Sequence, residues 1–209
     1  NDRDIEYDPF DTNLTDPTTA RERALSQEDY ETLLEATADL DDYYELQSKF
    51  VIVLAGRLGM RAGEIAHTDE DWVDVDSKTI NIPLHDKCTN GRDGGLCGSC
   101  RSSAKQMAEH NDAPLSETKE LYWKAKTAEA KRSIPYDFDS EIETIIEQYI
   151  GRFGEYTESA SGIHRSNERA LELAPEFDPD STMPQGLRAT AASYRASHGL
   201  NVWGLQHIM

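Results

Sequence analysis

Basic residues are scarce in this chain of 209 residues: 21 Lys and Arg stand against 40 Asp and Glu, which gives a formal net charge of −19. Proteins that bind nucleic acid usually carry a basic surface, so the composition taken alone favours an acidic protein that avoids nucleic acid. Eight of the 21 basic residues are lysine. An acidic surface poor in lysine is also expected of a protein that works in molar salt. At about 1 M salt the screening length falls to about 3 Å, so distant acidic groups hardly repel another anion.

Long apolar runs are absent too, and the chain does not open on a charged and then apolar signal sequence. We therefore expect a soluble, cytoplasmic protein with no membrane partner. The length suits one well-buried domain. Residues 1–25 are polar and acidic, contain Pro9 and Pro17, and show no periodicity. This pattern predicts a linker or tail ahead of a domain that covers residues 26–209.

Cysteine is limited to three residues, and their spacing indicates a metal site. His85 precedes Cys88 by three positions, and Cys97 precedes Cys100 by three positions. Four such ligands suit a tetrahedral zinc ion, which would be structural because no ligand position is left open for chemistry. His110 is an alternative fourth ligand. The other interpretation is three free thiols in a polar insertion at about residues 84–118.

Apolar residues recur with a helical period in some segments and alternate in others. The predicted helices begin at Ser26, which with Asp29 forms an N-cap signature, and continue at about residues 42–58, 140–152, 163–173, 185–198 and from 201 onward. The predicted strands are a hairpin of residues 72–75 and 79–82, and a second pair of residues 121–125 and 132–135. This order predicts an α+β domain that is mainly helical and contains a small three-stranded antiparallel sheet.

Three short basic segments are separated along the chain: residues 59–65 with Arg61, residues 125–135 with Lys126, and residues 184–190 with Arg188. Each lies where a predicted helix or hairpin would aim its cation at one point. Arginine's planar guanidinium binds two phosphate oxygens at once. The segments therefore predict a phosphate site built from distant parts of the chain.

In their order, spacing and element type these segments resemble the boxes of the tyrosine recombinase (phage integrase) family, and the resemblance covers the catalytic domain at residues 26–209. The acidic composition and the amino-acid sequence of the last segment, which contains Arg188, are similar to those of the family members from haloarchaea and their viruses. The resemblance implies that Arg61 and Arg188 stabilise charge on the reacting phosphate, and that Lys126 is the general acid. Gln185 occupies the position where most members of the family carry a histidine.

Two residue assignments within these boxes have alternatives. Glu64 lies one helical turn from Arg61 and is predicted to orient it by a charge-assisted hydrogen bond, the alternative being an ordinary surface pair. Lys124 and Lys131 are close to Lys126 in the predicted hairpin and compete with it as the general acid. The pattern of a Lys-Thr pair ahead of Arg-x-Ile-Pro favours Lys126.

The nucleophile of the resembled family is a tyrosine that becomes bonded to the DNA 3′ phosphate. Tyr194 lies only six residues after Arg188, within the same predicted helix, and is interpreted as a core residue. We therefore expect the nucleophilic tyrosine to lie beyond Met209.

The resemblance predicts a site-specific DNA recombinase, or integrase, that cleaves and rejoins strands through a 3′-phosphotyrosine intermediate. It implies a homo-tetramer on double-stranded DNA, with no metal or nucleotide in the chemical step. One alternative is a non-catalytic, DNA-binding relative that regulates integration or excision. Another is a zinc-stabilised interaction module whose arginines bind something other than DNA.

The charge of −19 makes a prediction about salt. Unscreened repulsion between acidic groups destabilises a compact state. The free energy of unfolding, measured by urea titration, is expected to rise steeply between 0.1 and about 2 M NaCl, since screening removes that repulsion. A stability that stays constant over this range would contradict the prediction.

Overall fold

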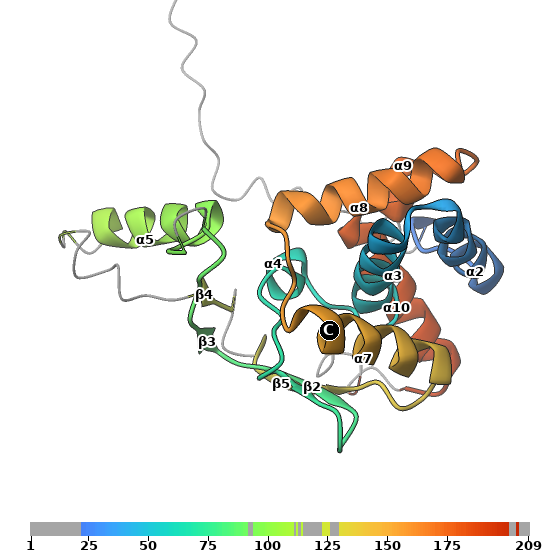
Figure 1. Ribbon diagram of the computed structural model, residues 1–209, viewed down its shortest axis with the longest axis horizontal. Coiled ribbons are helices and arrows are strands. Elements are labelled where there is room, and N and C mark those ends of the chain that lie inside the picture. Colours follow the sequence, from blue (N-terminus) through green and yellow to red (C-terminus); the bar gives the residue numbers. More distant parts are fainter. Residues whose placement is uncertain are drawn as a thin grey trace, which may run out of the picture.

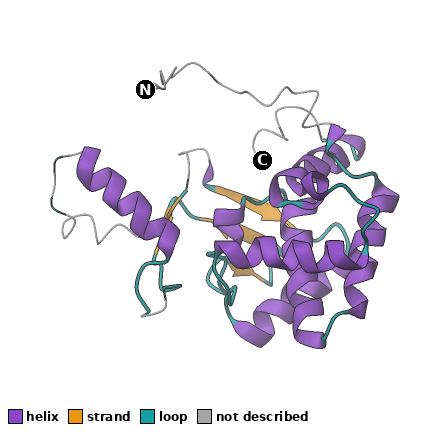
Figure 2. Cartoon of the chain, turned by 90° about the horizontal axis from the view of Figure 1, so that it is seen from above, coloured by secondary structure: helices purple, strands orange, loops and turns teal. Residues whose placement is uncertain are grey.

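The computed structural model describes residues 22–91, 94–110, 112, 114, 123–125, 130–200 and 204. A bundle of helices lies beside a small sheet, and a helical arm extends away from both (Figures 1 and 2). This arrangement confirms the predicted mainly helical α+β class. Residues 1–21 of the predicted linker lie outside the described residues, as does the predicted helix after residue 200, apart from the single helical residue Gly204.

Helix α3 (Asp42–Gly56) is the centre of the bundle. Its residues from Phe50 to Ala55 are fully buried, so the second half of the helix is covered on every side, as an all-apolar helical segment requires. Helices α2 (Gln27–Ala36), α7 (Ser140–Phe153), α8 (Ala160–Leu173) and α10 (Pro184–Ser197) pack around it (Figure 1). The N-cap predicted at Ser26 is confirmed, because its hydroxyl accepts a hydrogen bond from the Asp29 amide at 3.1 Å.

Strands β1 (Val73–Asp74), β2 (Thr79–Ile82) and β5 (Arg132–Pro135) form the predicted three-stranded antiparallel sheet, with β2 in the middle. Ile80 pairs with Val73 on one side and with Ile134 on the other. Lys78, in the turn between β1 and β2, forms ion pairs with Glu143 and Glu147 of α7. These contacts join the β1–β2 turn to the bundle.

The prediction of a second strand pair is wrong, because its two strands do not pair with each other. Strand β4 (Trp123–Lys124) pairs with β3 (His85–Asp86) in a separate two-stranded sheet, whereas β5 joins β2. The segment between β3 and β4 contains α5 (Gly98–His110), which stands apart from the bundle in both views. Alternation within a strand shows which face is buried but does not identify its partner.

Two short helices precede functional segments. Helix α4 (Ala62–Ile65) follows α3, and Arg61 is its N-cap. Helix α9 (Pro179–Thr182), which the sequence analysis did not predict, lies directly before α10. Among the described helices, none has both the length and the apolar composition needed to cross a membrane.

The contact between α9 and α10 predicts a difference between two glycine substitutions. A Cβ atom at Gly186 would lie 2.3 Å from the backbone oxygen of Asp180 and 2.5 Å from that of Ser181. Gly186→Ala is therefore expected to lower the free energy of unfolding by about 1–3 kcal/mol.

Gly151→Ala, on the exposed face of α7 with nothing within 4 Å of the new Cβ, is the matched control. It is expected to raise stability by about 0.5–1 kcal/mol. Urea unfolding in molar salt measures both, and a neutral Gly186→Ala would contradict the close approach.

Candidate functional site

Arg61 lies at the N-cap of α4 and is held there by Glu64. The Arg61 amide donates to Glu64 Oε2 at 2.8 Å, and Arg61 Nη1 donates to Glu64 Oε1 at 3.0 Å. The Glu64 side chain is 2% exposed and that of Arg61 is 33% exposed. The carboxylate is therefore a buried anchor, and the guanidinium still reaches the surface. The pair is therefore not the ordinary surface pair of the alternative, and the orienting role of Glu64 stays a prediction.

Arg132 also belongs to this site, although the sequence analysis gave this arginine no role. Its Nη1 and Nη2 donate to Glu64 Oε1 and Oε2 at 2.9 and 2.8 Å, a bidentate pair in which both side chains are buried. Strand β5 buries Arg132 and Ile134 and exposes Ser133. This period-2 pattern was the available signal, because it places Arg132 on the inner face where a charge needs a partner.

The pKa of Glu64 reflects this arrangement. Burial alone would raise it, but hydrogen bonds from Arg132 and Arg61, with the positive charge of Arg132, bring it below its usual range. Glu64 is therefore ionised at neutral pH. Removing its charge would leave the buried Arg132 without its anionic partner.

Arg188 enters the same site from the second turn of α10. Its Nη1 atom is buried and has no hydrogen-bond partner among the described residues. Burial first, and then the positive charge of Arg61, lower the pKa of Arg188 to about 10. The guanidinium therefore remains charged at neutral pH in surroundings that disfavour its charge. An anion placed beside it would supply the missing partner.

Glu64 pairs with both Arg61 and Arg132, and the charge of Arg188 interacts with all three groups, so three positive charges and one negative charge leave the cluster with a formal charge of +2. The whole chain, by contrast, carries −19. The composition therefore gave no indication of this local excess of positive charge, which suits a phosphate group.

An open pocket of about 470 Å³ gives access to this cluster. Its lining includes two of the arginines together with residues from α4, α8 and the start of α10: Arg61, Ala62, His164, Met183, Pro184, Gln185 and Arg188. Gln185 is exposed in the first turn of α10, beside Arg188 in the lining. The structure thus brings together the predicted Arg61, Glu64, Gln185 and Arg188.

His164 is a further residue of this pocket that the sequence analysis missed. It projects from α8, and its Nδ1 lies 3.4 Å from Met183 Sδ. Among the described residues that line the pocket, it carries the one imidazole. No sequence signal pointed to it, because α8 lies between the boxes and its packing against α10 is a tertiary contact.

The general acid stays a prediction. Lys126 lies outside the described residues, while its rivals Lys124, in β4, and Lys131, next to β5, are both exposed. Tyr194, interpreted from the sequence as a core residue, is half-buried and does not belong to the buried core. Its ring centre lies 4.2 Å from the Arg57 guanidinium, which also contacts the ring of Tyr30.

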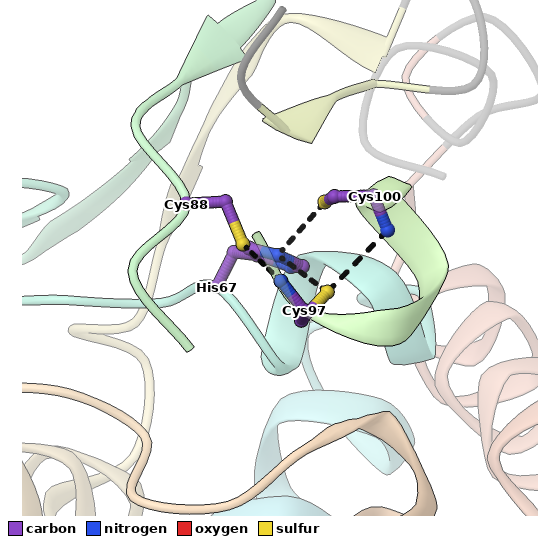
Figure 3. Close-up of side chains that lie close together, drawn as sticks. All are labelled: His67, Cys88, Cys97 and Cys100. Carbon is purple, nitrogen blue, oxygen red and sulfur yellow. Dashed lines mark hydrogen bonds between the residues drawn. The ribbon is translucent and has the colours of Figure 1, made fainter. Parts of the chain in front are cut away.

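The three cysteines come together in a second cluster, but the predicted fourth ligand is corrected. The residue beside Cys88, Cys97 and Cys100 is His67, which follows α4 (Figure 3). His85 is exposed in β3, and His110 is exposed at the end of α5; neither belongs to this group. Spacing along the chain favoured His85, which is nearer to Cys88 in the sequence. The fold instead brings the cysteines to the turn after Glu64, which carries His67.

Two substitutions distinguish Glu64, which is the buried anchor of the site, from Arg188, whose charge the fold disfavours. Glu64→Gln is expected to lower the free energy of unfolding by about 3–5 kcal/mol, because it leaves Arg132 buried with a neutral partner. Arg188→Met is expected to leave stability unchanged or raised, because it removes a charge that the fold disfavours at any pH below about 10. Urea unfolding at molar salt measures both. An equal loss in the two variants would show that Arg188 has a structural partner.

No protein-family model matches the chain, and no curated protein matches it. Solved structures do. The Tn1549 transposon integrase in complex with circular intermediate DNA matches with a TM-score of 0.60 and 18% identity, over 89% of this chain and 58% of that one. XerA recombinase matches with a TM-score of 0.58 and 14% identity, over 88% of this chain and 54% of that one. The chain thus spans a little over half the length of these neighbours, and it has the fold of the tyrosine recombinase catalytic domain.

Proposed function

We propose that this chain is the main part of the catalytic domain of a site-specific DNA recombinase of the tyrosine recombinase type. The observation that carries the proposal is the arginine cluster, above all the buried Nη1 of Arg188, which has no partner among the described residues and borders an open pocket. The fold and the sequence boxes support the same assignment independently.

A phosphodiester is the anion that this cluster suits. When an oxygen nucleophile attacks the phosphorus, negative charge accumulates on the non-bridging oxygens, and fixed donors aimed at them lower the barrier. Arg61 and Arg188 line the pocket and act as these donors. Arg132, which is 1% exposed and paired with Glu64, is a positioning residue that keeps the Glu64 carboxylate beneath Arg61.

The start of α10 provides a second source of positive potential. The first amides of a helix point toward its N-terminus, where they favour an anion. Gln185 lies in this first turn, and its side-chain amide can donate to a phosphate oxygen but cannot transfer a proton near neutral pH. His164 lies in the same pocket and supplies an imidazole, the group that the resembled family places at the position of Gln185.

The remaining parts of the mechanism extend the proposal beyond the described residues. The departing 5′ oxygen needs a proton, for which Lys126 is the candidate. The nucleophile is a tyrosine beyond Met209, which would form the 3′-phosphotyrosine and conserve the bond energy for rejoining. Four protomers on two double-stranded DNA sites would exchange the strands. The Tn1549 integrase was solved in complex with DNA, which supports DNA as the substrate here.

The acidic surface is compatible with this function in molar salt, the environment that we propose for the protein. Screening at about 1 M salt limits repulsion between the acidic surface and DNA to groups within about 3 Å. The cluster of charge +2, in direct contact with the phosphate, keeps its attraction because contacting charges are screened least.

A non-catalytic, DNA-binding relative is the second candidate. Glutamine in place of the histidine at position 185 favours it, because a glutamine can bind a phosphate without transferring a proton. Such a relative would retain the arginines and form no covalent product.

Covalent trapping decides between the two candidates. The full protein, including its sequence beyond Met209, is incubated in molar salt with nicked duplexes selected for binding from a random pool. Denaturing gels then measure the protein–DNA adduct. Arg61→Ala and Arg188→Ala are each expected to slow adduct formation by about 100-fold or more. Arg152→Ala, in the last turn of α7 and outside the pocket lining, is the matched control and should match wild type.

Three outcomes are informative. An adduct that forms at wild-type rate in both arginine variants would overturn the proposed roles of Arg61 and Arg188. DNA binding without adduct in the wild-type protein would establish the non-catalytic relative. Neither DNA binding nor adduct at molar salt would overturn both candidates.

A further inference from the structure

Four side chains with metal-binding atoms meet at the base of the arm that holds α5. His67 comes from the turn after α4, Cys88 follows β3, and Cys97 and Cys100 flank the start of α5. One ligand atom from each lies within 4.8 Å of all the others, and all four residues are buried. Figure 3 shows the four side chains pointing toward one common centre.

The distances match those around a tetrahedral metal. His67 Nε2 lies 3.4 Å from Cys100 Sγ and 3.7 Å from Cys97 Sγ. With Zn–S of about 2.3 Å and Zn–N of about 2.0 Å at tetrahedral angles, sulfur and nitrogen ligands are about 3.5 Å apart. Three sulfurs and one imidazole nitrogen are a ligand set that zinc takes in closed, structural sites.

The surroundings orient the ligands for this use. His67 Nδ1 lies 2.7 Å from the backbone oxygen of Gly63, so it donates its proton there and leaves Nε2 free for a metal. Trp123 stacks on the His67 ring at 5.5 Å and fixes its plane. Backbone amides donate to two of the sulfurs, from Cys97 to Cys88 Sγ at 3.3 Å and from Cys100 to Cys97 Sγ at 3.4 Å. Such donors stabilise the thiolate form that binds a metal.

We propose that His67, Cys88, Cys97 and Cys100 bind one structural zinc ion, which ties the inserted arm to helix α4. This inference corrects the ligand set that spacing alone predicted, and it does not rest on the proposed recombinase function. The closed set of four protein ligands leaves no position for substrate, so the metal stabilises structure and takes no part in chemistry.

The consequence for α4 follows from its length. A helix of four residues is too short to be stable by itself. The Glu64 contacts with Arg61 and Arg132 hold its single turn from the N-terminal side, and His67, two residues beyond its C-terminal end, holds the other side through the metal. Zinc therefore fixes, from the opposite end, the helix that positions the arginine cluster.

Metal analysis of the purified protein in molar salt tests the site. Elemental analysis by mass spectrometry is expected to find one zinc per chain. Replacement by Co²⁺ is expected to produce the intense visible absorption of tetrahedral thiolate coordination. His67→Ala and Cys100→Ser should each reduce bound zinc at least tenfold, and His67→Cys should retain it, because four thiolates also form a closed zinc site.

His85→Ala is the matched control: it removes the histidine that spacing favoured, which is exposed, and should keep one zinc per chain. A loss of zinc in His85→Ala equal to that in His67→Ala would overturn the assignment of the fourth ligand. Wild-type protein with less than about one tenth of a zinc, even after dialysis against Zn²⁺, would overturn the site. This last measurement needs no variant, so a folding failure in the variants cannot obscure it.

Hydrogen exchange tests the coupling to α4. Removing zinc from the wild-type protein with a chelator is expected to speed amide exchange at residues 62–68 at least tenfold. Exchange in the middle of α7, a helix that packs against α3 and supplies no residue of the cluster, is the internal reference and should stay constant. Unchanged exchange at residues 62–68 after complete loss of zinc would overturn the role proposed for the metal. Neither readout involves DNA, so both stand apart from the trapping experiment.

Discussion

The buried carboxylate of Glu64 is the interaction on which the candidate site depends. It accepts two hydrogen bonds from Arg132 of β5 and two from Arg61, and thereby joins the sheet to the start of α4. Removing one partner from a buried ion pair is strongly destabilising, so the buried Arg132 depends on this carboxylate. One carboxylate cannot neutralise three guanidinium groups, and the fold brings Arg188 in as the third. The positive charge left over is the property of this cluster that suits an anion.

Local and global charge therefore differ in this protein. The chain as a whole is acidic, with a formal charge of −19, and its composition pointed away from nucleic acid. The charge close to a bound ligand, however, comes from the few residues that line the pocket. The arginines among these residues are positive. High salt separates the two effects, because it screens the distant acidic groups far more than charges in contact.

Helix α4 connects the two clusters. Arg61 and Glu64 belong to the arginine cluster, and His67, three residues after Glu64, belongs to the cysteine cluster. Gly63 contributes its backbone oxygen to His67 from within the same short helix. A phosphate site requires fixed donors, because donors that must reorganise during the reaction lose much of their effect. A four-residue segment held at both ends by buried polar contacts meets this requirement without a long helix.

The sequence by itself predicted helices that correspond to α2, α3, α7, α8 and α10, a small antiparallel sheet, and the candidate residues Arg61, Glu64, Gln185 and Arg188, since periodicity and short motifs are local properties. It predicted neither α5 nor α9. Only the tertiary structure decided which strands pair, and that Arg132, His164 and His67 join the sites. Arg132 reaches Glu64 across 68 positions, and His67 reaches Cys100 across 33. Spacing favoured His85, only three residues from Cys88, yet β3 leaves that side chain exposed. Contacts over such separations depend on how elements pack, and local spacing does not encode that packing.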